Sequence, residues 1–136
     1  MADMEKWNHK DEWKQRGKNF MVSVSRHSVK SDEHAPHRWC VYVYIYSQHP
    51  HFKNFSVNAM WQDAASMLPL HGGPTFLRWH FDESGNAPVT VQVGCDYNHL
   101  YDDNFTRSAT PNEAYEVFSD AQTLFDWMAN YESAEV

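Results

Sequence analysis

Basic side chains are scarce in this sequence. Lysine and arginine together number 11 against 18 aspartate and glutamate residues, and the formal charge is −7 with histidine neutral. A long nucleic-acid partner needs a basic surface for its phosphates, so this balance disfavours one. A small nucleotide, held by one or two arginines and by backbone N–H groups, remains compatible with the composition.

Cysteine is also rare, with only Cys40 and Cys95. Each lies in a strand-like apolar run, where a reduced cysteine behaves as a small hydrophobic side chain. A disulfide between them requires the two strands to be neighbours, and the sequence leaves that open. The first residues are charged and include no apolar run, so we expect no signal peptide and a reducing cytoplasm as the simplest location.

Long hydrophobic runs and several familiar motifs are missing. No stretch approaches the length of a membrane span, so we expect no membrane partner. The sequence has no P-loop, dinucleotide-binding fingerprint, nucleophile elbow or zinc-finger spacing. With 136 residues the chain fits one domain, which we divide into an N-terminal arm or helix over residues 1–18 and a core over residues 19–131.

Aromatic residues, in contrast, make up 15% of the chain. The strongest strand signal covers residues 38–46, where aliphatic and tyrosine side chains alternate. The aliphatic set is Val41, Val43 and Ile45, and the tyrosine set is Tyr42, Tyr44 and Tyr46. A sheet with aromatic side chains on its second face is usually covered there, and a homo-oligomer is one possible cover.

The other elements predict an α+β domain. We expect further strands over residues 20–25, 75–81 and 89–93, a hairpin turn at residues 84–86, and a short helix over residues 58–68 that Pro69 ends. A capping box runs from Thr110 to Glu113, and a long helix with apolar side chains at helical spacing follows it. The fold class is therefore an antiparallel sheet of about four strands with a long C-terminal helix packed on one face.

Two short motifs are the best candidates for chemistry. In the first, His71 precedes Gly72 and Gly73, so its imidazole can act as a general acid or base while the glycine N–H groups bind an anion. In the second, Asp96 and His99 lie three residues apart, and the carboxylate can orient the imidazole. A buried histidine beside a glycine turn, and an Asx-turn at Asp96, are the structural alternatives.

Other residues complete the predicted site. Arg78 can bind a phosphate with two hydrogen bonds, and Tyr97 can stack on a base. His49, which precedes Pro50, is a further ligand-binding candidate, although a loop residue at the sheet edge is an equal alternative, and we expect His51 to be exposed. A divalent metal is an open possibility, with His71, Asp96 and His99 as candidate ligands.

The order of these motifs resembles that of a family of small tailed-phage proteins of uncharacterised function. Its members carry a strand, a Gly-His-Pro element, a His-Gly-Gly element, a strand that ends in Gly-Xaa-Asp-Xaa-Xaa-His, and a terminal helix. The matching segments here are residues 38–46, 49–50, 71–76 and 94–99 and the helix after Thr110. Gln48 and Pro74 stand where the family has glycine and leucine. The resemblance covers residues 38–131 and implies a phage origin, with action in the cytoplasm of an infected bacterial host.

Three functional hypotheses follow from the motifs and the resemblance. The first is a counter-defence enzyme that cleaves a phosphodiester bond in a small nucleotide signal, with His71, His99 and Asp96 as catalytic residues. The second is a protein that binds and sequesters the nucleotide without a reaction. The third is an interaction module that inhibits a host protein, in which the histidines are structural. The link to host defence is an analogy from the resemblance alone.

Overall fold

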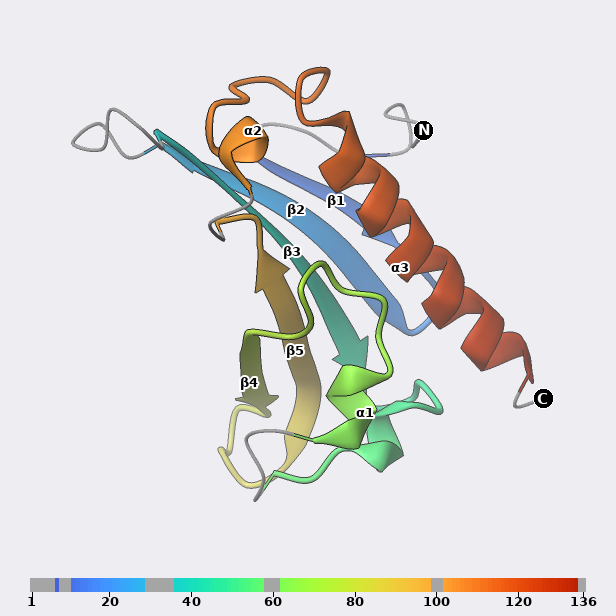
Figure 1. The fold of residues 1–136 in the computed structure, drawn as a ribbon. Helices are drawn as coiled ribbons and strands as arrows, with labels where there is room; N and C mark the ends of the chain where they lie inside the picture. The colour runs from blue at the N-terminus through green and yellow to red at the C-terminus, as the bar shows by residue number, and fades with distance from the viewer. Residues whose placement is uncertain (1–6, 8–10, 29–35, 58–61, 99–101, 135–136) are drawn as a thin grey trace.

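Five antiparallel strands form one sheet in the order β1-β2-β3-β5-β4 in the computed structural model (Figure 1). The strands are β1 (Glu12–Arg16), β2 (Phe20–Ser28), β3 (His37–Tyr46), β4 (Phe76–Phe81) and β5 (Pro88–Asp96). The helices are α1 (Asp63–Ser66), α2 (Asp103–Thr106) and α3 (Tyr115–Ala134), with a 3-10 helix, η2, at Phe52–Asn54. The structure describes residues 7, 11–28, 36–57, 62–98 and 102–134. The predicted α+β class, with a long C-terminal helix on the sheet, is confirmed.

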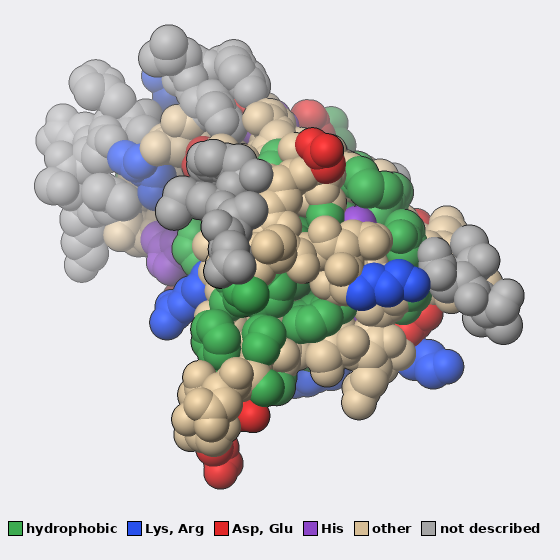
Figure 2. All heavy atoms as spheres, turned by 90° about the horizontal axis from the view of Figure 1, so that it is seen from below, with side chains coloured by type: hydrophobic (Ala, Val, Ile, Leu, Met, Phe, Trp, Pro, Cys, Tyr) green, Lys and Arg blue, Asp and Glu red, His purple; other side chains and the backbone are tan. Residues whose placement is uncertain are grey.

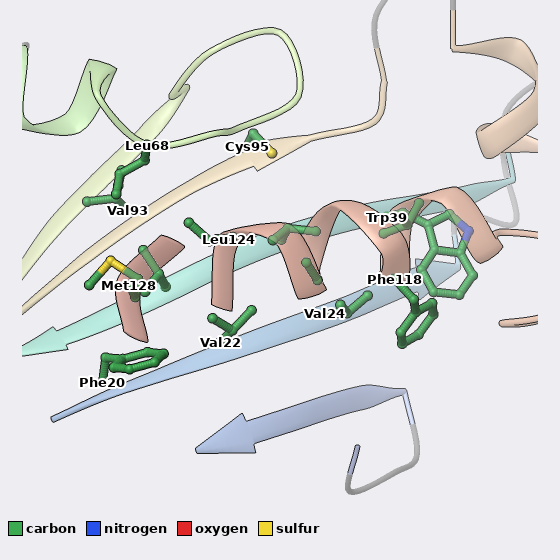
Figure 3. Close-up of a cluster of buried hydrophobic side chains, with 14 of the residues drawn as sticks. Phe20, Val22, Val24, Trp39, Leu68, Val93, Cys95, Phe118, Leu124 and Met128 are labelled. Atoms are coloured by element: carbon green, nitrogen blue, oxygen red, sulfur yellow. The ribbon is translucent and has the colours of Figure 1, made fainter. Parts of the chain in front are cut away.

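The apolar core lies between α3 and one side of the sheet (Figure 3). Side chains alternate across a strand, so each strand contributes every second residue to this side. The sheet contributes Phe20, Val22, Val24, Trp39, Val41, Val43, Ile45, Val91, Val93 and Cys95. Residues at helical spacing in α3 and in the turn before it belong to the same core, namely Ala114, Val117, Phe118, Ala121, Leu124 and Met128. The predicted alternation in β3 and periodicity in α3 are therefore both present.

The fifth strand is β1, in the segment where the sequence predicted an arm or a helix. Trp13 is the reason for this difference, because its ring is only 4% exposed and stacks on Trp39 at 5.6 Å between centroids. Burying an indole of this size offsets the cost of ordering an otherwise polar segment. The residues on either side of Trp13 then point away from the core. Of the predicted arm, residues 1–6 and 8–10 lie outside the described residues.

The described part of the short helix is shorter than predicted, whereas the predicted cap of the long helix is present. The described part of the predicted short helix, α1, covers only Asp63–Ser66, and residues 58–61 lie outside the described residues. The capping box before α3 is present, since the Glu113 N–H donates to Thr110 Oγ1 at 3.3 Å and the Ala109 N–H donates to Glu113 Oε1 at 3.3 Å. These bonds satisfy backbone N–H groups that no helical turn can pair.

The described helices lie on the core side of the sheet, and the other side carries tyrosines (Figure 1). We call this second side the tyrosine face and define it by Lys14 and Arg16 of β1, Tyr42, Tyr44 and Tyr46 of β3, and Phe76 and Arg78 of β4. No described helix covers it. The sequence predicted a cover for this side, and within the described part of the chain none is present.

The two cysteines are free thiols on opposite sides of the sheet. Cys40 of β3 lies opposite Asp96 of β5, while Cys95 lies opposite Val41. Neighbouring positions in a strand point to opposite sides, so Cys95 faces the core and Cys40 the tyrosine face. The strands are adjacent, but the thiols are not paired.

Hydrophobic side chains gather at the end of the molecule that carries α1 and the hairpin between β4 and β5 (Figures 1 and 2). Exposed large hydrophobic residues in these segments and in the turn after η2 are Val57, Met67, Phe81 and Val89. The hairpin turn itself is the predicted one, with Gly85 at φ 76°.

Replacing Leu124 with alanine should lower the free energy of unfolding by about 3 kcal/mol, because the change removes a fully buried side chain and leaves a cavity. Leu124 is 0% exposed, whereas Tyr115 of the same helix is 47% exposed. Tyr115→Ala is therefore the matched control and should change the free energy by less than about 0.5 kcal/mol. Chemical denaturation measures both values, and equal losses would contradict the packing of α3 described here.

Candidate functional site

His71 lies at the centre of a hydrogen-bonded network that joins four segments. Its Nε2 is 2.8 Å from Oδ1 of Asp102, whose side chain is 1% exposed at the start of α2. Its ring stacks on Tyr97, just after β5, with centroids 4.3 Å apart and planes 11° apart. The Tyr97 hydroxyl donates to Oδ2 of Asp120 in α3 at 2.7 Å. The imidazole is therefore oriented by one buried carboxylate and one ring.

The glycines after His71 make the turn that positions it. Gly72 and Gly73 have φ values of 70° and 85°, which other residues rarely adopt. The Gly73 N–H donates to the Leu70 carbonyl at 3.0 Å, so this predicted anion donor is already used by the turn. The glycine pair therefore forms a turn, which is the structural alternative to anion binding by its N–H groups.

Burial controls the titration of the groups behind His71. It raises the pKa of the Tyr97 hydroxyl, and the nearby Cys95 and Asp120 raise it further, so Tyr97 is a neutral donor to Asp120. Burial also raises the pKa of the Cys95 thiol to about 12, although a hydrogen bond from the His71 backbone acts in the opposite direction. Cys95 is therefore an unreactive thiol at neutral pH.

A pocket of about 320 Å³ adjoins the network and is lined by Pro69, Leu70, His71, Asp120 and Thr123. An imidazole held by a buried carboxylate beside an open pocket is an arrangement suited to proton transfer. The described lining contains the Asp120 carboxylate and no lysine or arginine. This charge distribution disfavours a phosphate group inside the pocket.

Asp96, the predicted partner of a histidine, lies on the other side of the sheet. Its neighbour Cys95 faces the core, so the Asp96 side chain points to the tyrosine-bearing side. Thr75 Oγ1 donates to one of its oxygens at 3.3 Å, and the Asn98 N–H donates to the other at 3.2 Å, which is the Asx-turn. His99 lies outside the described residues, so the predicted pairing of Asp96 with His99 stays a prediction.

Asp102 was missed in the sequence, although it makes the shortest described contact to a candidate histidine. It is 31 residues from His71 and lies in a polar segment where an aspartate usually caps a helix. In the structure Asp102 stands at the N-cap of α2 without a side-chain capping bond. The sequence carries no signal for this role, because only the structure shows that the Asp102 side chain makes no capping bond to α2.

His49 and His51 serve the fold, because both ring nitrogens of each are occupied. His49 Nε2 donates to the Met128 carbonyl at 3.0 Å, and the His51 N–H donates to His49 Nδ1 at 3.0 Å. His51 Nε2 donates to the Ala64 carbonyl at 2.9 Å, while its Nδ1 accepts from Asn54 at 2.9 Å. The expectation that His51 is exposed is wrong, since its exposure is 0%. His49, a predicted ligand-binding residue, is 1% exposed and ties β3 to α3.

Arg78 lies on the tyrosine face rather than beside His71. Its neighbours Leu77 and Trp79 pack against the core, so Arg78 points to the other side and is exposed. Burial and the negative charge of Glu12 raise the pKa of the nearby Tyr44, while the positive charges of Lys14 and Arg78 act in the opposite direction. The predicted phosphate-binding arginine therefore shares its surface with a tyrosine, and the sheet separates it from His71.

The tyrosine face is shaped by close packing around Tyr42. A Cβ atom on Gly94 of β5 would lie 2.3 Å from a ring carbon of Tyr42, so only glycine fits beneath this ring. Phe76 of β4 contacts the same ring edge-on, with centroids 5.3 Å apart. His80 lies 6.0 Å from Tyr44 and bonds to Gln92 at 2.9 Å. The rings thus form an ordered aromatic surface.

No protein-family model, curated protein or solved structure matches this chain. The resemblance to small tailed-phage proteins therefore stays a prediction. Within the described ranges, no three histidine, cysteine or acidic side chains gather where they can hold a metal ion. None of the described helices has the length and apolar character needed to cross a membrane.

The burial of His51 should make the protein less stable in acid. Burial lowers the pKa of His51 below its ordinary value of 6.5, so below that pH the unfolded chain binds more protons than the folded one. The free energy of unfolding should then fall as the pH decreases below about 6.5, by at most about 1.4 kcal/mol per pH unit from this group.

Chemical denaturation of the parent protein and His51→Gln between pH 5 and 7.5 measures this effect. Glutamine retains a donor and an acceptor but does not titrate, so its curve should be flatter. His27→Gln, at an exposed position, is the control and should keep the parent slope. Parallel curves for all three proteins would exclude His51 as the source.

Proposed function

We propose that this protein binds a small nucleotide on the tyrosine face and sequesters it. The observation that best supports this proposal is a line of three tyrosines beside Arg78 and Lys14, on a side of the sheet that no described helix covers. Base rings stack on aromatic side chains, and a guanidinium binds phosphate oxygens with directed hydrogen bonds. Both parts of a nucleotide thus find matching groups on one surface.

The pocket at His71 offers less to a phosphate. Asp120 contributes a carboxylate to its lining, the Gly73 N–H is used within the turn, and Arg78 lies across the sheet. These three observations separate the imidazole from the groups that the phosphodiester hypothesis requires around a phosphate. They favour the sequestering hypothesis, in which binding needs no catalytic base.

The biological setting is proposed from the resemblance to small tailed-phage proteins. A phage protein that traps a nucleotide signal removes it from a host defence without a chemical step. Such trapping acts inside the infected cell, which fits the free thiols of Cys40 and Cys95. We therefore propose a counter-defence role in the host cytoplasm.

Replacing Tyr44 with alanine should weaken nucleotide binding about tenfold, because one base-stacking contact is worth about 1–3 kcal/mol. Calorimetric titration with mononucleotides and cyclic dinucleotides measures the dissociation constant. Tyr44→Phe keeps the ring and should retain most of the affinity, while Arg78→Ala should weaken ligands with more phosphates most strongly.

Tyr115→Ala is the control for this series, since Tyr115 is an exposed tyrosine on α3. Its dissociation constant should equal that of the parent protein. Heat release of bound ligand followed by mass spectrometry shows whether the nucleotide is unchanged. Absence of binding by every nucleotide tested, or equal binding by Tyr44→Ala and the parent, would refute the proposed function.

A second candidate is cleavage of a nucleotide at His71, favoured by the buried Asp102 that orients the imidazole beside a pocket. In this reaction His71 accepts the proton of an attacking water, and Asp102 stabilises the charged ring. His71→Ala should then reduce the rate by about 10² to 10⁴-fold. Chromatography of nucleotides after incubation measures it, with His27→Ala as an exposed control. Intact ligands in all samples would remove this candidate.

A further inference from the structure

The register of the sheet arranges the tyrosine face in rows that cross the strands. One row runs through Lys14, Ser23, Tyr42, Gly94 and Phe76, in the order β1 to β4. The next row runs through Arg16, Met21, Tyr44, Gln92 and Arg78. Tyr42 and Tyr44 therefore each stand on the central strand, with smaller or flatter groups beside them and cations or an aromatic ring at the borders.

The tyrosines repeat at alternate positions of β3, so their Cα atoms are about 7 Å apart along the strand. One base covers one ring, which leaves the other two rings uncovered by a mononucleotide. A ligand that uses all three rings needs several bases in a line. The row of tyrosines thus matches an extended single strand better than one nucleotide.

Cations lie on both sides of the line of tyrosines along β3. Neighbouring strands are about 4.8 Å apart, so Arg16 of β1 and Arg78 of β4 each lie two strand spacings, or roughly 10 Å, from Tyr44. Lys14 forms an ion pair with Glu12 at 3.0 Å, and both side chains are exposed enough for a phosphate to compete for the ammonium. A sugar-phosphate backbone on either side of the stacked bases therefore meets positive charge.

The groups beside the tyrosines are buried, so the tyrosine rings form the outer layer of this face in the described structure. Met21, Ser23 and Gln92 are 7%, 0% and 8% exposed, although no described helix covers this side. The ring of Tyr42 lies directly over Gly94. A ligand on this face therefore meets the half-buried tyrosine rings first, which is the contact that base stacking requires.

The third row marks where the surface changes sign. Glu12 and Asp96 stand at the two borders of the row that contains Cys40, next to the row of Tyr42. Two carboxylates at this end repel a phosphate backbone. The strip without carboxylates therefore starts at Tyr42, next to the row of Cys40, and extends to Tyr46, whose row holds Thr90 and His80.

We infer that the tyrosine face takes a single-stranded nucleic-acid segment of about three nucleotides, with one base on each of Tyr42, Tyr44 and Tyr46. This inference rests on the proposed nucleotide binding and specifies its ligand class. The −7 charge of the chain does not oppose it locally, because α3, on the other side of the sheet, carries four acidic residues and no basic one.

Calorimetric titration with thymidine monophosphate and oligothymidylates of two, three, four and six residues tests the inference. Affinity should rise about tenfold with each added base up to the third and change little afterwards. A stable duplex, such as long poly(dA)·poly(dT), should bind far more weakly, since its bases are stacked on each other. Raising the salt concentration should weaken the trinucleotide, and Arg16→Ala and Arg78→Ala should each reduce that salt dependence.

Variants of single rings locate the bases. Tyr42→Ala and Tyr46→Ala should each weaken the trinucleotide about tenfold, whereas Tyr46→Phe should not. Tyr115→Ala is the matched control on α3. Circular dichroism checks that each variant folds. If an alanine variant does not fold, the phenylalanine variant of the same tyrosine keeps the test valid.

The outcomes separate the two proposals. Equal affinity for thymidine monophosphate and the trinucleotide would overturn the single-strand inference and leave the proposed function intact. Absence of binding by mononucleotides and oligonucleotides alike would overturn both. Self-association that sedimentation detects and Tyr44→Ala abolishes would make this side an interface between copies of the chain, and would also overturn the inference.

Discussion

The one-sided packing of α3 on the sheet determines the two surfaces of this protein. Side chains alternate across a strand, and α3 packs on one side of β2 and β3, so the intervening residues of these strands are directed to the other side. A shift of one residue in any strand would exchange the two sets and expose the core. The tyrosine face is thus fixed by the same register that forms the core.

The fold was predictable where the sequence repeats a local pattern. Alternation from Val41 to Tyr46 and the cap at Thr110 each involve residues close in sequence, so periodicity and spacing reveal them. β1 was not predictable in this way, because Trp13 is its one large apolar residue and finds its partner Trp39 only after the sheet forms. The candidate site was predictable in part for the same reason. His71 stands out beside its two glycines in the sequence, whereas Asp102, 31 residues away, reaches it only in the folded chain.

The histidines show why residue type alone does not define a site. His49 and His51 each bond to a backbone carbonyl through Nε2 and accept at Nδ1, so each ring bridges two segments of the chain. His71 instead contacts the buried carboxylate of Asp102 and lines a pocket. The partner of the imidazole, and not its motif, separates a structural histidine from one that can transfer protons.

Net charge is too coarse a measure for predicting the partner of this chain. Charges separated by more than a Debye length, about 8 Å at physiological ionic strength, are largely screened. Packed layers of secondary structure lie about 10 Å apart, so the acidic side chains on α3 lie beyond that distance from the tyrosine face. A phosphate approaching Tyr44 therefore responds mainly to the charges of the same face, which are Arg16, Lys14 and Arg78 together with the carboxylate of Glu12. A scarcity of basic residues in the whole sequence is compatible with a basic surface, provided that the sheet separates the two kinds of charge.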